Sequence, residues 1–425
     1  MTAEGSTPTP GPDDAGGRAA ESAPGLVAAA PRPSPSLAQL FRAFFLVGST
    51  AFGMATLQNV RSATVKRGWL SLAEIDEGLG LVQLYPGAMM VDLVTYIGYR
   101  SRRVRGALVA AAGFVAPSLL MMLGLSWLYA AYGAAPGMSS MVIGLNAIVV
   151  GVVASVAVDF AGQHARGRLA AVLAFAAFAV GVAGANLLWA VLFGLLVGAV
   201  ALRPKSPQGI PGESPEDVAF SRSRSRFAMA FVPAALVLGF VGAAAFAGGA
   251  MRDLVSTMAT IGSVAFGNGS TILPVLQQEV VTNHHWLSLQ EFGVGVAFGQ
   301  ATPGPFLSTA AFVGFRVAGL PGGLLAEIAI FAPSVAMTTV AAEIYPYLRR
   351  HSWVKGALAG IMAAFVGLLA TVVLSLGRQV LPIPAALVLS AGAFVAIRTF
   401  KLNALAVFAA GLAAWAAYLA LGGSV

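Results

Sequence analysis

The stretch Trp286–Pro305, WLSLQEFGVGVAFGQATPGP, decides the fold of this chain, because an earlier stretch carries the same pattern. That earlier stretch is Trp69–Gly87, WLSLAEIDEGLGLVQLYPG. Each begins with Trp-Leu-Ser-Leu, has a glutamate three residues after the serine, and ends with a glutamine three residues before Pro-Gly. Proline and glycine interrupt helices, so both stretches predict an apolar segment that is broken at the same place.

The repeat extends well beyond these two stretches. The offset between matched residues stays between 214 and 217 along the chain. The further matched pairs are Phe52-Gly53 with Phe266-Gly267, Gly98-Tyr99-Arg100 with Gly314-Phe315-Arg316, and Ala116-Pro117-Ser118 with Ala332-Pro333-Ser334. A tandem repeat with helix breakers at matching positions of its apolar segments is typical of a transporter whose site lies between the two halves.

The composition independently indicates a membrane protein. Of 425 residues, 58% are hydrophobic and 10% are charged, and the mean hydropathy is +0.82. Such a chain cannot cover itself with an ordinary water-exposed surface. Its 50 glycines are typical of closely packed membrane helices.

Charge and residue inventory exclude several classes of function. The net charge is +8, but the lysines and arginines fall in short loops beside apolar runs, which indicates membrane topology and argues against nucleic-acid binding. The absence of cysteine excludes disulfides and thiolate metal sites. The four histidines lack the spacing of a metal site, so we expect no metal and no cofactor.

The chain is expected to have five parts. Its N-terminal segment is rich in Pro, Gly, Ala and Ser and lacks an apolar stretch long enough for a signal peptide, and a second polar break contains the run Ser221–Arg226. The parts are a disordered tail (1–38), a first transporter repeat (39–202), a cytoplasmic linker (203–226), a connecting transmembrane helix (227–253) and a second repeat (254–425).

The positions of the basic residues predict hairpins in the first repeat. Lys66, Arg67 and the cluster at 100–105 mark two loops as cytoplasmic. The apolar segment between them must then return to its starting side, so we expect Leu79–Tyr99 to be two half-helices that turn at Tyr85-Pro86-Gly87. With a cytoplasmic N-terminus, the segment Leu40–Gln58 turns near Phe52-Gly53 in the same way. Four crossings follow, near Gly106–Tyr132, Met138–Val158, Leu169–Gly184 and Leu187–Leu202.

The second repeat is expected to have the opposite orientation. Where the first repeat has Lys66 and Arg67, the second has Gln277, Gln278 and Glu279, and of the other basic cluster only Arg316 remains. An inverted copy must lose the charges that mark the cytoplasmic side. The sequence therefore predicts an all-α polytopic membrane protein with two inverted-topology repeats and broken helices.

The chemistry of the site follows from the broken helices. A helix that begins inside the membrane presents free backbone N–H groups and the positive end of its dipole, which bind anions. Small residues and hydroxyl or amide donors near the breaks suit an oxyanion. The candidate substrate-binding residues are Gly53, Thr56, Gln83, Gly87, Gly267, Asn268, Gly269, Ser270, Thr271, Gln300, Gly304 and Ser308. The alternative is that Gly and Pro only kink packed helices.

The motifs of the second repeat resemble the signature of the chromate ion transporter family in its long, two-domain form. They are Phe266–Gly269, Leu273–Val281, Trp286-Leu287 and Gln300–Pro305, and the resemblance spans about Leu40 to Leu376. It implies export of chromate across the bacterial plasma (inner) membrane, with sulfate as the related anion and chromate resistance as the outcome. The chain departs from the family pattern at Phe52–Ala55, at Pro86–Ala88 and at Asn268, and transport of another inorganic or small organic anion stays open.

Ionisable residues inside apolar segments are functional candidates by default. Asp92 lies six residues past Pro86, where it either carries a coupling proton, holds Arg100, or is a packed structural acid. Arg100 and Arg316 occupy matched positions at the two mouths, where they attract a dianion or anchor the helices at the membrane interface. Asp159 is expected to pair with Arg166.

Two other classes of protein and the assembly stay open. A channel also uses broken helices. A membrane hydrolase needs a nucleophile with a histidine base, and Gly124-Leu125-Ser126 is the one fragment that suggests such a nucleophile. No residue pattern identifies the coupling ion. A homodimer stays open as the assembly. Besides the anion, the residues imply one partner, the lipid bilayer.

Overall fold

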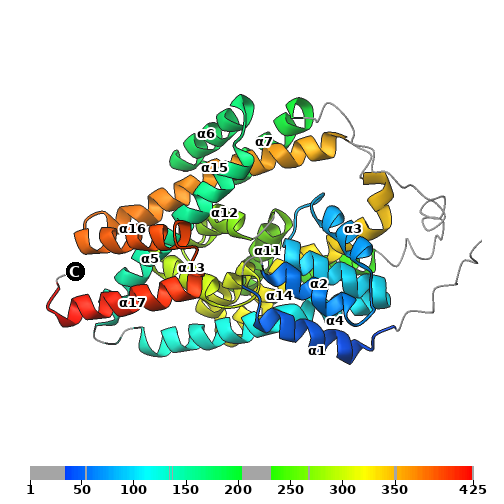
Figure 1. Ribbon diagram of the computed structural model, residues 1–425, viewed down its shortest axis with the longest axis horizontal. Coiled ribbons are helices and arrows are strands. Elements are labelled where there is room, and N and C mark those ends of the chain that lie inside the picture. Colours follow the sequence, from blue (N-terminus) through cyan, green and yellow to red (C-terminus); the bar gives the residue numbers. More distant parts are fainter. Residues whose placement is uncertain are drawn as a thin grey trace, which may run out of the picture. The chain divides into compact units, whose positions relative to one another are not determined.

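The computed structural model describes residues 34–52, 55–133, 135, 137–202, 231–266, 269–348 and 352–423 (Figure 1). The described residues form one compact unit, which is helical and has no strand within these ranges. This confirms the all-α polytopic class. The predicted tail up to Pro33 and the predicted linker lie outside the described residues, as do Gly53, Gly267 and Asn268.

The first repeat has seven helices in its described part and the second repeats their order. The first contains α1 (Leu37–Ser49), α2 (Ala55–Val65), α3 (Leu72–Val82), α4 (Met89–Tyr132), α5 (Met138–His164), α6 (Arg168–Val182) and α7 (Leu187–Ala201). After α10 (Val232–Ala247), the second contains α11 (Gly249–Ser263), η2 (Ser270–Ile272), α12 (Leu273–Gln277), η3 (Gln278–Asn283), α13 (Leu289–Ala301), η4 (Phe306–Ser308), α14 (Thr309–Leu348), α15 (Ser352–Val380), α16 (Pro384–Arg398) and α17 (Ala404–Ala420).

The matched Trp-Leu-Ser-Leu motifs begin matched helices. At the start of α3, the Ser71 hydroxyl accepts the backbone N–H of Glu74, and the Glu74 carboxylate accepts the backbone N–H of Ser71. Ser288 and Glu291 form the same reciprocal pair at the start of α13. Each pair satisfies N–H groups that a helix start leaves free, which explains why the serine and the glutamate recur at this spacing.

α4 and α14 each consist of two antiparallel arms. The backbone leaves the helical region at Arg102 and Arg103 (φ −143° and 54°) and at Ala318 and Gly319 (φ −144° and 61°). A Cβ on Gly98 would lie 2.3 Å from the carbonyl oxygen of Gly106, although eight residues of straight helix span ~12 Å. The chain therefore reverses, and the first arms (89–101 and 309–317) lie against the second arms (104–132 and 320–348).

The broken segments fold back as hairpins. A Cβ on Gly78 in α3 would lie 2.5 Å from the Tyr96 ring in the first arm of α4, so the chain turns between them, at Pro86-Gly87. In the second repeat, Gly295 in α13 meets Phe312 of α14 in the same way, which places the turn at Pro303-Gly304. Both turns lie where the Pro-Gly pairs predict them.

The last helices of each repeat pack on the other repeat. α6 and α7 lie along α15, and a Cβ on Gly367 of α15 would lie 1.8 Å from the Ala174 carbonyl oxygen of α6. α16 and α17 lie along α5, where Gly151 meets the Ser390 carbonyl oxygen at 2.2 Å by the same measure. Glycine allows this close approach of helix backbones in a membrane protein. The two repeats are thus intertwined.

Helix lengths modify the predicted crossings. Among the residues that the structure describes, four helices are long and apolar enough to span a membrane: α4, α5, α14 with η4, and α15. α6 and α7 have 15 residues each, about 22 Å of helix, against a hydrocarbon core of about 30 Å. Each of these two helices is therefore too short to cross the membrane at full length, contrary to what the sequence predicted.

Candidate functional site

The breaks of the two repeats meet each other. The Gly304 N–H donates to the carbonyl oxygen of Ala51, at the end of α1, over 2.9 Å. Gly269 has a positive φ of 82°, and a Cβ there would lie 2.5 Å from the Leu307 side chain. The turn at Pro303-Gly304, which is the second break of the second repeat, thus touches the first break of each repeat, next to Ala51 in the first repeat and at Gly269 in the second. These contacts bring together three of the four predicted helix breaks, all except the turn at Pro86-Gly87.

The second break of each repeat also contacts the other repeat. Pro86-Gly87 lies against the second arm of α14, and Pro303-Gly304 lies against the second arm of α4. The Ala88 N–H donates to the Ser334 hydroxyl over 3.1 Å, and the Tyr85 and Thr338 hydroxyls lie 2.7 Å apart. In reciprocal positions, the Ser118 and Ser308 hydroxyls lie 2.9 Å apart, and the Thr302 hydroxyl donates to the Met122 sulfur over 3.7 Å. This exchange is the pattern that a pseudo-two-fold axis between the repeats produces.

The candidate donors differ in whether they are free. Thr271 is 2% exposed and already donates to the Phe266 carbonyl oxygen over 2.7 Å. Thr56 is 4% exposed at the start of α2, and Ser308 is fully buried. The backbone of Ser270 begins η2, whereas its side chain is outside the described part.

The two matched glutamines lie in different surroundings. Gln83 ends α3 and is exposed. Gln300 is partly buried, and its Nε2 is a buried donor without a hydrogen-bond partner in the described part of the chain. A buried amide donor is costly to leave unpaired, so Gln300 is the stronger of the two candidates for an anion contact.

Asp92 is fully buried on the first arm of α4. Its Oδ1 accepts the Thr338 hydroxyl over 3.3 Å, and its Oδ2 has no hydrogen-bond partner among the described residues. The backbone of Gly87 lies against this carboxyl group, since a Cβ there would be 2.1 Å from Oδ2. Asp92 is therefore held at the interface of the two repeats, beside the first repeat's Pro-Gly turn.

Arg100 and Arg316 close the two hairpins. Arg316 pairs with Glu291 over 2.6 Å, and Arg100 pairs with Glu74 over 3.5 Å. Each guanidinium thus joins the start of one hairpin arm to the end of the other. Arg100 is bound to Glu74 and not to Asp92, which removes one of the three roles considered for Asp92. Attraction of an anion by either arginine stays a prediction.

The expected Asp159–Arg166 pair is wrong. The Arg398 guanidinium of α16 donates to Asp159 over 2.5 Å, while Arg166 donates to the carbonyl oxygen of Gly162. Arg398 reaches Asp159 because α16 of the second repeat packs on α5 of the first. Proximity in the sequence, which favoured Arg166, does not reveal this packing.

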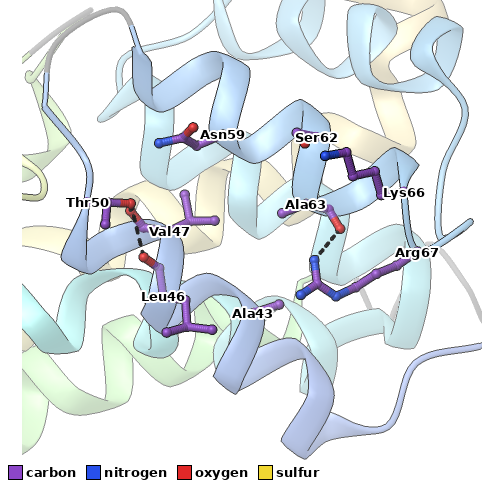
Figure 2. Close-up of a pocket in the computed structure, with 9 residues that line it drawn as sticks. All are labelled: Ala43, Leu46, Val47, Thr50, Asn59, Ser62, Ala63, Lys66 and Arg67. Atoms are coloured by element: carbon purple, nitrogen blue, oxygen red, sulfur yellow. Dashed lines mark hydrogen bonds between the residues drawn. The ribbon is translucent and has the colours of Figure 1, made fainter.

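A groove between α1 and α2 leads toward the breaks. It encloses about 290 Å³, and Figure 2 shows Lys66 and Arg67 at one end and Thr50 and Asn59 at the other. Thr50 directly precedes Ala51, the residue that accepts the Gly304 N–H. In the sequence analysis, Lys66 and Arg67 served only to predict a cytoplasmic loop. Their position across the groove from α1 follows from the predicted first hairpin.

The described part of the chain does not assemble a hydrolase site at Ser126. The Ser126 hydroxyl donates to the Met122 carbonyl oxygen over 2.6 Å. The described histidines bond elsewhere: His164 to Phe160, His284 to Thr257, and His285 to Val281. No nucleophile with an adjacent base is formed there.

Broken helices that meet between two intertwined repeats define the class of membrane transporters with internal repeats. The sequence profile described as chromate transporter matches residues 38–199 and 252–416. The chain therefore belongs to the chromate transporter family.

Relatives from distant organisms agree with this membership. A chromate transport protein of Cupriavidus metallidurans is 31% identical over 366 residues, which cover 84% of this chain and 86% of that protein. A probable chromate transport protein of Synechococcus elongatus is 30% identical, with coverage of 82% and 86%. An uncharacterized transporter of Methanocaldococcus jannaschii is 27% identical, with coverage of 80% and 84%. No solved structure matches the chain.

Proposed function

We propose that this protein carries chromate across the plasma membrane by alternating access, with the anion bound where the breaks of the two repeats meet. The contact between Gly304 and Ala51 carries this proposal, because it joins the broken helices of both halves at one place. At the remaining break, which these contacts do not include, α4 begins with Ala88 at its N-cap and has no side-chain cap. Its N–H groups favour an anion.

The substrate follows from the relatives together with the donors at the breaks. Two of the relatives are named for chromate transport. Gln300, whose amide donor has no hydrogen-bond partner in the described part of the chain, and the Ser308 hydroxyl supply neutral donors, which suit a tetrahedral oxyanion such as chromate or the isosteric sulfate. The departures from the family pattern lie at these breaks, so another small anion is the alternative substrate.

The membrane potential favours export. Moving one charge through 100 mV is worth about 2.3 kcal/mol, so a dianion that leaves an inside-negative cell gains roughly 4.6 kcal/mol per 100 mV. With a cytoplasmic N-terminus, the groove at Lys66 opens toward the cytoplasm and gathers the anion on the side from which it leaves. Export of this kind confers chromate resistance.

The test is uptake of radiolabelled chromate into inverted membrane vesicles that contain the protein. We expect saturable uptake that excess sulfate inhibits and that unlabelled chromate inside the vesicles accelerates. Vesicles with the Gln300→Leu variant, shown to insert normally, should lose most of the uptake. Uptake that is linear in concentration, without counter-transport, would indicate a channel, and no uptake by folded wild-type protein would mean a different anion.

A further inference from the structure

A second buried carboxyl group, Glu327, lies beside the proposed anion site. It is on the second arm of α14 and is 2% exposed. The Ser308 hydroxyl and the backbone of Ala311, on the first arm, lie next to it. Neither of its carboxyl oxygens forms a hydrogen bond of normal geometry within the described residues, so Ser308 and Ala311 approach the carboxyl group without closing one. The repeat places Ala111 at the matching position of the first half, so packing of the arms does not require an acid there.

No cation compensates Glu327 in the described part of the protein. The elements that pack on α14 are α3, α4, α10, α11, α13 and η4. Their charged groups that form ion pairs do so elsewhere, and none of those pairs includes Glu327. Among residues whose side chains the structure describes, the titratable groups on these elements are Glu74, Asp76, Glu77, Asp92, Tyr96, Tyr99, Arg100, Arg102, Arg103, Arg105, Tyr129, Tyr132, Arg252, Asp253 and Glu291, and on α14 itself, besides Glu327, Arg316 and Glu343.

An isolated ionised carboxylate is too costly at this depth. Burying one without a partner costs several kcal/mol, so the neutral acid is the stable form. Glu343, on the same arm, shows the contrast, because it accepts the Tyr99 hydroxyl over 2.7 Å and pairs with Arg103 over 3.0 Å. The arm therefore carries one acid with a cation and one without.

We propose that Glu327 is a proton-binding site coupled to anion transport through Ser308. The inference rests on the proposed function, in which Ser308 lies at the anion site and also contacts Ser118 of the other repeat. In the closed conformation Glu327 holds a proton. When the repeats separate and water reaches it, the proton leaves, and a dianion bound at Ser308 favours its return. Anion binding and proton binding thus strengthen each other by the same factor.

The experiment measures proton uptake on anion binding. Purified protein in lipid nanodiscs, in weak buffer with a pH-indicator dye, receives sulfate, which stays a dianion across the tested pH range, and then chromate. We expect the wild type to take up protons and to bind the anion less tightly as pH rises. Glu327→Gln, which mimics the neutral acid, should take up none and bind with an affinity that no longer changes with pH. Glu343→Gln is the matched control and should behave as wild type.

Infrared spectroscopy decides the point without any anion. The carbonyl stretch of a protonated carboxylic acid should be present in the wild type and in Glu343→Gln, and its intensity should fall in Glu327→Gln. Glu327→Asp, which keeps an acid, should restore proton uptake if Gln disturbs folding. An unchanged band in Glu327→Gln, or proton uptake equal to that of wild type, overturns the proposal. Absence of anion binding in the wild type refutes the proposed substrate, while the band still tests Glu327.

Discussion

At the scale of single residues, Gly304 occupies a constrained position in the site. Its φ is 114°, and a Cβ there would lie 2.7 Å from the Ser118 Cβ. Gly304→Ala combines backbone strain with a clash, so we expect at least a roughly tenfold loss of transport, as for a misplaced reacting group. Gly319→Ala is the control, because φ is 61° there but nothing lies within 4 Å. Equal transport by both variants would separate Gly304 from the site.

Lys66 offers a test of the groove. It lies at the end of the groove remote from Thr50, and its side chain makes no hydrogen bond or ion pair in the described structure. Lys66→Gln should raise the KM for chromate about threefold and leave the maximal rate unchanged, because a surface charge affects encounter more than turnover. Transport kinetics at low and high salt would show it, since the difference from wild type should shrink as salt rises. A KM equal to that of wild type at low salt contradicts this role.

At the scale of elements, the ion pair between Glu291 and Arg316 joins the two arms of a hairpin. Both side chains are partly exposed, so the pair is worth about 0.5 kcal/mol. Glu291→Gln keeps the hydrogen bond to Ser288 that starts α13, because glutamine also fits this motif, and removes only the charge. Thermal unfolding of Glu291→Gln, Arg316→Gln and the double variant should give a small coupling energy and similar losses of stability.

The same variants separate this structural role from anion attraction. If the arginine only joins the arms, neither variant changes the KM for chromate. If Arg316 attracts the anion, Glu291→Gln frees its charge and lowers the KM, whereas Arg316→Gln raises it. Opposite shifts in KM would therefore contradict a purely structural pair and restore the prediction made from the sequence.

Local sequence signals predicted the hairpins but not their partners. Pro86-Gly87 and Pro303-Gly304 act through the backbone, so they predict a break wherever they occur. The pairing of Asp159 with Arg398 depends on α16 packing against α5, about 240 residues apart, and no local pattern encodes it. Gln83 and Gln300 look equivalent in sequence, yet one is exposed and the other is partly buried, because the two repeats have diverged around them.

At the scale of the whole molecule, the exchange of helices between repeats decides how stability is distributed. α6 and α7 bury their glycine-containing faces on α15, whereas α16 and α17 pack on glycines of α5, Gly151 and Gly144. A repeat by itself leaves these faces without their partner. The interface between the halves is therefore part of the fold of each half, and a conformational change must preserve these contacts or move them as a unit.

A chain divided between Gly212 and Glu213, within the predicted linker, tests this dependence. Expressed together, the two pieces should assemble and transport chromate, because the contacts of Gly367 with Ala174 and of Gly151 with Ser390 cross between them. Expressed alone, each piece should be degraded or aggregate in detergent. Gly367→Leu in the second piece should prevent co-purification, since even a Cβ would lie 1.8 Å from a backbone oxygen, whereas Gly377→Leu, with open space around it, should not. A first piece that is stable and monodisperse by itself would mean that α6 and α7 find their packing within their own repeat.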